Sequence, residues 1–129
     1  MQIHQSAEDY LETILMLNQR MGRVRSIDVV NELGYTKASV SIAMKKLREN
    51  GYIAVDGEGN LTLLEPGREI AERIYSRHRL LTHFFVQLGV DEEVAAEDAC
   101  KAEHILSEQT LEKIRESALR NDAAHPQAK

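Results

Sequence analysis

The chain has 129 residues, of which 43% are hydrophobic, enough for one compact domain or two small domains that pack closely. Because no run of residues is long and apolar enough to cross a membrane, and because the polar N-terminus does not resemble a secretion signal, we expect a cytoplasmic protein. The net charge of -5 argues against a uniformly nucleic-acid-binding surface, and the single cysteine, Cys100, excludes an internal disulfide.

Three helices are predicted in the first half of the chain. Apolar residues recur at helical spacing over about residues 7–21, and again in two shorter segments that follow. The two shorter helices are joined by the tight turn 34–36, which predicts a helix-turn-helix. The expected N-caps are Ser6, Ser26 and Thr36, and the expected stops are Gly22, Gly34 and Gly51.

Two short apolar runs follow the third helix. Residues 52–55 and 61–64 indicate strands, and the connecting residues 56–60 include two glycines, which suit the turn of a β-hairpin. A hairpin directly after a helix-turn-helix predicts the wing of a winged-helix domain.

Three further helices are predicted in the second half, the first of them long. They run from Pro66 to about Gly89, from Asp91 as cap to about Leu106, and from Ser107 as cap to about Arg120. The predicted fold class is therefore mainly α. We expect a winged helix-turn-helix domain at residues 1–65, an all-helical domain at residues 66–121, and a disordered tail at residues 122–129.

The charge is distributed unevenly along the chain. Residues 20–50 carry seven basic and three acidic side chains, whereas residues 91–129 carry five basic and ten acidic ones. A helix-turn-helix inserts the N-terminal turn of its second helix into the major groove of DNA, where small hydroxyl and basic side chains can contact phosphates and bases. Taken one at a time, these side chains can equally form a cap and a solvated face. The candidate DNA-binding residues are Arg25, Thr36, Lys37, Ser39, Ser41 and Lys45.

Two groups of potential metal ligands have helical spacing. Asp9 and Glu12 lie three residues apart in the first helix, and Cys100, Glu103 and His104 lie at positions i, i+3 and i+4, so each group shares one helix face. Mixed carboxylate, imidazole and thiolate donors suit a divalent transition metal better than Ca²⁺ or Mg²⁺. With His78 from the long helix, the candidate metal ligands are Asp9, Glu12, His78, Cys100, Glu103 and His104.

Each of these residues also has a simpler interpretation. Asp9 can cap its helix, Glu12 can be solvated, Cys100 can be a small buried side chain, and His78 can lie on a basic surface. The spacing places ligands on a shared face only within one helix. It does not bring the three helices together.

The chain resembles the diphtheria toxin repressor and manganese transport regulator family of metal-dependent repressors over nearly its whole length, in a two-domain form. This resemblance implies a winged helix, a helical dimerisation domain, a metal site between the two domains, and a homodimer on a palindromic operator in double-stranded DNA. It also implies that metal binding promotes operator binding. The segments that carry the resemblance are EDYLETI at residues 8–14, TKASVS at 36–41, RHRLL at 77–81 and DACKAEHILS at 98–107.

The candidate ligands combine two branches of this family. Asp9 and Glu12 resemble the manganese-sensing branch, whereas Cys100 resembles the iron-sensing branch. Thr82 and Ala96 stand where the iron branch has ancillary ligands, so an ancillary metal site is not expected. Because a soft thiolate favours Fe²⁺ while the hard carboxylates favour Mn²⁺, we slightly favour Fe²⁺, with Mn²⁺ as the close alternative.

Two other functions compete with a metal-dependent repressor. One is a winged-helix regulator that senses a small organic ligand, in which the cluster around Cys100 is structural. The other is a metallohydrolase, since metal-bound carboxylates and histidines can activate water. The sequence has no glycine-rich phosphate loop, nucleophile elbow or HExxH motif, so we expect neither an enzyme nor a small organic substrate.

Overall fold

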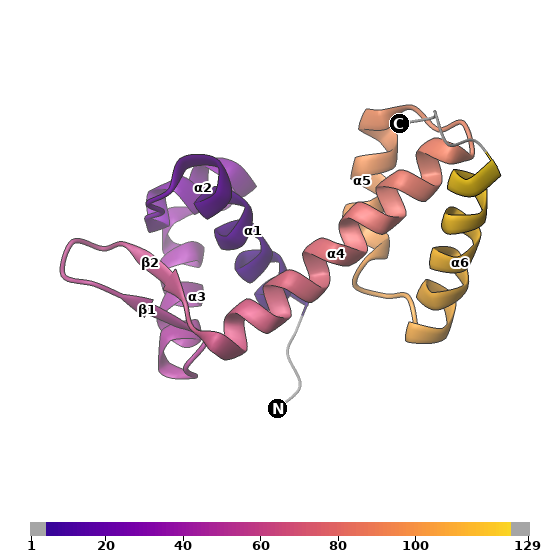
Figure 1. Cartoon of the computed structure of the whole chain (residues 1–129). Coiled ribbons are helices and arrows are strands. Elements are labelled where there is room, and N and C mark those ends of the chain that lie inside the picture. The colour runs from indigo at the N-terminus through magenta and orange to yellow at the C-terminus, as the bar shows by residue number, and fades with distance from the viewer. Residues whose placement is uncertain (1–4, 125–129) are drawn as a thin grey trace. The chain divides into compact units, whose positions relative to one another are not determined.

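The computed structural model describes residues 5–124 and is mainly helical, as predicted (Figure 1). It divides into two compact units, with the boundary between Arg73 and Ile74, inside the long helix α4 (Glu65–Gln87). Among the described residues, no helix has both the length and the apolar character that a membrane span requires.

The first unit contains the predicted helix-turn-helix. Helices α1 (Gln5–Met21), α2 (Ser26–Leu33) and α3 (Lys37–Glu49) pack on one another around a core that includes the fully buried Leu11 and Ile14. The apolar stripe predicted from the helical period is the face of α1 that forms this core.

The N-termini of these helices differ in part from the prediction. Thr36 caps α3 as expected, because its Oγ1 accepts a hydrogen bond of 3.1 Å from the backbone N–H of Ser39. Ser6 lies inside α1 rather than capping it, since α1 already includes Gln5. Ser26 is the first residue of α2, and Arg25 is the N-cap, with its backbone N–H donating to the Asp28 carboxylate at 2.9 Å.

The predicted wing is present as an antiparallel hairpin. Strand β1 (Ile53–Val55) pairs with β2 (Leu61–Leu63), and each strand is one residue shorter than expected. Ile53 and Leu63 face each other across the hairpin and are both buried, which fixes the hairpin on the helices of the first unit.

The second unit is a small helical domain. The C-terminal part of α4 packs with α5 (Glu92–Ala102) and α6 (Glu108–Ala124) around a buried core of Leu81, Ala99 and Leu111. Leu80, Phe85, Ala102, Leu106 and Ile114 surround this core.

Two helix ends predicted in this unit are wrong. Helix α5 ends at Ala102 rather than at about Leu106, and residues 103–105 form a turn. Leu106 packs on the core although it lies beyond the helix. Its apolar side chain at helical spacing therefore did not mark the end of α5. Helix α6 extends to Ala124, so residues 122–124 of the expected tail are helical, and residues 125–129 lie outside the described residues.

Candidate metal centre and DNA-binding face

Three of the candidate metal ligands lie together in the second unit. His78 comes from α4, Cys100 from α5, and Glu103 from the C-cap position of α5. Nδ1 of His78 lies 2.9 Å from Oε1 of Glu103. One ligand atom from each of the three side chains lies within 4.8 Å of the other two. The sequence spacing predicted that Cys100 and Glu103 lie close together. His78 joins them because α4 packs on α5.

The burial of these side chains bears on the simpler interpretations. Glu103 is fully buried, and the His78 side chain is 17% exposed, so His78 does not lie on an open basic surface. Cys100 is exposed and is therefore not a small buried side chain. Burying a carboxylate is unfavourable unless hydrogen-bond donors or a cation lie beside it. The imidazole of His78 is placed to act as such a donor to Glu103.

His104 occupies a different position from the one predicted. The helical face expected for Cys100, Glu103 and His104 ends at Glu103, because His104 lies in the turn after α5. Its side chain is nevertheless 1% exposed, and its Nε2 lies 3.9 Å from Oε2 of Glu103. His104 is thus adjacent to the group formed by His78, Cys100 and Glu103 without belonging to it.

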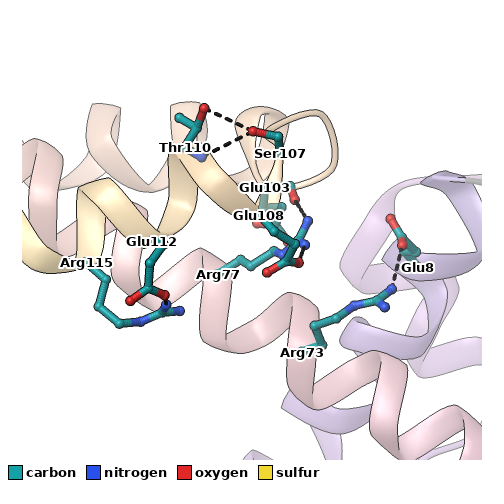
Figure 2. Close-up of polar contacts among 9 residues, drawn as sticks. All are labelled: Glu8, Arg73, Arg77, Glu103, Ser107, Glu108, Thr110, Glu112 and Arg115. Atoms are coloured by element: carbon teal, nitrogen blue, oxygen red, sulfur yellow. Dashed lines mark hydrogen bonds and ion pairs between the residues drawn. The ribbon is translucent and has the colours of Figure 1, made fainter.

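Asp9 and Glu12 lie on α1 in the first unit. Glu12 is 5% exposed, which excludes the interpretation that it is a solvated side chain. Asp9 is half-buried and is the fifth residue of α1, beyond the positions at which a side chain caps a helix. The neighbouring Glu8 forms an ion pair of 3.2 Å with Arg73 of α4 (Figure 2).

The group in the second unit fits a divalent transition metal. It offers one imidazole nitrogen, one thiolate sulfur and carboxylate oxygens, a donor mixture typical of first-row transition metals. Ligand atoms about 2.0 to 2.3 Å from an ion are separated from one another by about 3 to 4 Å. The three ligand atoms lie within 4.8 Å of one another, so these side chains are near enough to approach a single ion.

One contact beside this group has no counterpart in the sequence analysis. Arg77, the residue before His78, donates a hydrogen bond of 3.1 Å to the backbone carbonyl of Glu103 and forms an ion pair with Glu108 (Figure 2). Arg77 and Glu108 are 31 residues apart, and no periodicity relates positions so distant. The sequence showed only that Arg77 is a basic residue next to the candidate ligand His78.

The candidate DNA-binding residues lie on and beside the exposed face of α3. Lys37, Ser39, Ser41 and Lys45 are all exposed, whereas Val40, Met44 and Leu47 form the buried face. Ser41 and Lys45 line an open hollow of about 260 Å³ together with Ser26, Met44, Arg48 and Val55. Lys37, Ser41 and Lys45 are four residues apart and share one helix face. Exposed hydroxyl and basic groups on such a face are suited to contacts with a phosphate backbone.

Arg25 has a defined structural contact. Its guanidinium donates to the backbone carbonyl of Glu58 in the turn of the wing, and its backbone forms an isolated bridge with Asn60. Arg25 therefore fastens the wing to the start of α2 while its side chain remains exposed.

An aromatic contact links α1 to the turn before α3. The rings of Tyr10 and Tyr35 meet edge to face, with centroids 5.9 Å apart. Burial raises the pKa of Tyr10, and the nearby Tyr35 and Asp9 add to this effect. The Tyr10 hydroxyl is consequently neutral at physiological pH.

Comparison with known proteins assigns each half of the chain to a described domain. Residues 2–61 match the N-terminal DNA-binding domain of iron-dependent repressors, and residues 64–126 match their metal-binding and dimerisation domain. An uncharacterized helix-turn-helix transcriptional regulator from Methanocaldococcus jannaschii is 36% identical over 113 residues, covering 86% of this chain and 90% of that protein. The transcriptional regulator MntR from Bacillus subtilis is 35% identical over 109 residues, covering 84% of this chain and 77% of that protein.

Solved structures agree with these matches. A manganese-dependent transcriptional repressor in complex with manganese superposes with a TM-score of 0.79 and 28% identity, covering 87% of this chain and 52% of that chain. The manganese regulator SloR superposes with a TM-score of 0.74 and 25% identity, covering 90% of this chain and 54% of that chain. The chain thus spans about half the length of the solved structures that it matches.

Proposed function

The chain belongs to the iron-dependent repressor family, which includes the diphtheria toxin repressor and manganese transport regulator types, and from that premise we propose that it represses transcription when a divalent transition metal is bound. The observation that carries the proposal is the meeting of His78, Cys100 and Glu103 inside the domain assigned to metal binding. A DNA-binding domain and a metal-binding domain in one chain suit a regulator whose affinity for DNA depends on metal.

We propose that all six candidate ligands take part in metal binding. His78, Cys100 and Glu103 supply the group described above, and the buried His104 lies beside it. Asp9 and Glu12 are included because the family resemblance implies carboxylates from the first helix. When bound, the metal would compensate the negative charge that these carboxylates gather.

The donor set supports Fe²⁺ slightly over Mn²⁺ as the physiological metal. Cys100 is exposed and its Sγ lies within 4.8 Å of ligand atoms of His78 and Glu103, so a sulfur ligand is available to a softer ion. The carboxylates of Asp9 and Glu12 would favour Mn²⁺, and two of the similar solved structures are named for manganese. Mn²⁺ is therefore the close alternative.

The DNA-binding role is assigned to α3 and its surroundings. Thr36, Lys37, Ser39, Ser41 and Lys45 would contact phosphates and base edges, and Arg25 would hold the wing beside them. We propose a homodimer on a palindromic operator, because a two-fold symmetric dimer presents two equivalent recognition helices to two half-sites. We assign the protein no catalytic activity.

Metal titration under anaerobic conditions tests the proposed metal site. Wild-type protein titrated with Mn²⁺ or Fe²⁺ in a calorimeter should take up metal in a fixed ratio per subunit, and Glu103→Gln should lose this uptake. Glu112→Gln is the matched control, because Glu112 is exposed and pairs only with Arg115 among the described residues. Absence of stoichiometric uptake by the wild type would contradict the proposal and favour a sensor of organic ligands.

The contribution of α1 needs a separate variant. Asp9→Asn should also weaken metal binding if the carboxylates of both units share the ion. Metal affinity unchanged in Asp9→Asn would contradict the six-ligand proposal.

A further inference from the structure

Arg77 is the most buried arginine for which the structure gives an ion pair. Its side chain is 15% exposed, whereas the paired arginines Arg20, Arg68, Arg73 and Arg115 are 45% to 61% exposed. Burying a guanidinium is unfavourable unless its donors are satisfied. The partners of Arg77 therefore indicate why the protein retains a charge at this position.

These partners are the end of one helix and the start of the next. Helix α5 ends at Ala102, so the carbonyl of Glu103 has no acceptor role within a helix, and Nη1 of Arg77 donates to it at 3.1 Å. Nη2 of Arg77 pairs with the carboxylate of Glu108, in the first turn of α6. One guanidinium fork thus fastens both ends of the turn between α5 and α6 to α4 (Figure 2).

This turn carries two of the candidate metal ligands. Glu103 opens the turn and His104 follows, while His78 is the residue next to Arg77 on α4. The 2.9 Å contact between His78 and Glu103 therefore depends on how firmly the turn is held against α4. Outer contacts that orient metal ligands commonly contribute as much as about 10- to 100-fold to metal affinity.

We infer that Arg77 is a positioning residue for the proposed metal site, which clamps the turn of residues 103–107 so that Glu103 and His104 stay in place beside His78. Arg77 itself, as a cation, does not bind the metal. The inference rests on the proposed metal-dependent function, but the clamp exists in the metal-free protein and can be tested there.

Hydrogen exchange in the metal-free protein tests the clamp directly. In the turn, the backbone N–H groups of Ile105 and Leu106 donate to the carbonyl of Ala102 at 3.1 and 3.3 Å. Arg77→Gln should accelerate exchange at Ile105 and Leu106 while leaving the exchange of the helix α1 amides unchanged. Equal exchange rates in variant and wild type would overturn the inference, whatever the metal-binding result.

Metal affinity supplies the second readout. Arg77→Gln should weaken Mn²⁺ or Co²⁺ binding by about 10- to 100-fold. Arg77→Lys should restore little of it, because an ammonium group cannot bind both acceptors in the fork geometry. Arg79→Gln is the matched control, because this substitution also removes one positive charge next to His78. Arg79 is exposed, and its guanidinium lies over the ring of Tyr75, 5.9 Å from the centroid. Affinities that fall equally in the Arg77 and Arg79 variants would show a general charge effect and overturn the inference.

A second variant guards against loss of folding. Glu108 is 81% exposed, so Glu108→Gln removes one end of the clamp without creating a buried defect. It should weaken metal binding in the same direction as Arg77→Gln, and the double variant should lose less than the sum of the two single losses. Strict additivity would contradict a shared clamp.

The visible spectrum of bound Co²⁺ separates positioning from a general structural role. At saturating Co²⁺ the Arg77→Gln protein should retain the thiolate-to-cobalt charge-transfer band of Cys100, because α5 remains folded, while needing more Co²⁺ to reach it. A band lost at all Co²⁺ concentrations would mean that the variant cannot form the cobalt–thiolate bond and would overturn a positioning role. Failure of the wild type to bind metal would instead overturn the proposed function. In that case the hydrogen-exchange rates of the metal-free protein alone would test the clamp.

Discussion

Cys100 is the residue that most strongly distinguishes this donor set. Its thiol is exposed and lies close to His78 and Glu103. A substitution of Cys100 can therefore change which metal the group prefers without disturbing the core. Because a carboxylate is a harder ligand than a thiolate, Cys100→Glu should shift the ratio of Fe²⁺ to Mn²⁺ affinity several-fold towards Mn²⁺. Competitive anaerobic titration with a fluorescent chelator measures this ratio for both metals.

A neighbouring substitution controls for the added charge. Lys101→Glu introduces a carboxylate at the next, exposed position, outside the ligand group of the second unit, and should leave the ratio close to that of the wild type. A ratio that Cys100→Glu leaves unaltered would mean that this side chain does not determine metal preference.

At this scale the sequence indicated which side chains could bind metal but not which of them meet. The spacing of Cys100 and Glu103 survives because the helical geometry continues to the C-cap, where Glu103 has φ -59° and ψ -24°. His78 joins them through tertiary packing, since Leu81 of α4 and Ala99 of α5 belong to one buried core that no local period encodes. Arg77 was not identified because its partners lie 26 and 31 residues away.

At the scale of elements, Gly67 allows the first turn of α4 to lie close to the backbone of Tyr52, the residue before strand β1. A Cβ atom at this position would lie 2.2 Å from the backbone oxygen of Tyr52 and 3.3 Å from the side chain of Leu11. The same Tyr52 carbonyl accepts from the N–H of Leu64 at 3.0 Å and is therefore fixed. Gly67→Ala should lower the free energy of unfolding by about 1 to 3 kcal/mol, as overpacking typically does.

Urea unfolding measures this change against a matched glycine. Gly57 has open space around it and no left-handed backbone, so Gly57→Ala should leave the free energy of unfolding unchanged or raise it by about 0.4 to 1 kcal/mol. Equal stability of the Gly67→Ala and Gly57→Ala proteins would show that α4 and the Tyr52 backbone are not in close contact.

The turn of the wing should respond to acid through Asp56. Its carboxylate accepts from the N–H groups of Glu58 and Asn60, both at 2.9 Å, and from the side-chain amide of Asn60 at 3.0 Å. The hydrogen bonds from Asn60, backbone first, hold the pKa of Asp56 below its ordinary value of 3.8. Since the folded pKa is lowered, this stabilisation is fully present above the ordinary carboxyl pKa and is lost as the pH falls through the folded value.

NMR can follow this loss at single amides. The amide protons of Glu58 and Asn60 should shift upfield together as the pH falls below the ordinary carboxyl range, and the shift should vanish in Asp56→Asn, which cannot titrate. Amide shifts in this turn that are the same in Asp56→Asn would assign the transition to another carboxylate.

Two helix beginnings were predicted correctly from local capping signals. Thr36 and Ser107 cap α3 and α6 as expected, because capping is a local interaction between one hydroxyl and an N–H three residues later. The end of α5 depends instead on tertiary contacts, in which Glu103 turns to His78 and its carbonyl binds Arg77. No glycine follows α5, so the sequence lacked the usual stop signal there.

At the scale of the whole molecule, the chain joins a unit that carries the recognition helix to a unit that carries most of the candidate ligands. Metal can change the affinity for DNA only if it binds more tightly to the DNA-competent form than to the alternative. Ligands drawn from both units would provide this difference. The sequence predicted the winged helix and the helical second domain from pattern alone, whereas the proposal that ligands from both units bind one metal rests on the family resemblance.

The most direct test of this account is the affinity for DNA with and without metal. Under anaerobic conditions, fluorescence anisotropy would measure binding to a DNA fragment selected from a random library in the presence of Mn²⁺, with added Fe²⁺, Mn²⁺, Zn²⁺ or a chelator. We expect Fe²⁺ or Mn²⁺ to raise the affinity over that in chelator, by an amount within or above the roughly 5- to 150-fold typical of allosteric coupling. An affinity in chelator equal to that in both Fe²⁺ and Mn²⁺ would contradict metal-dependent repression.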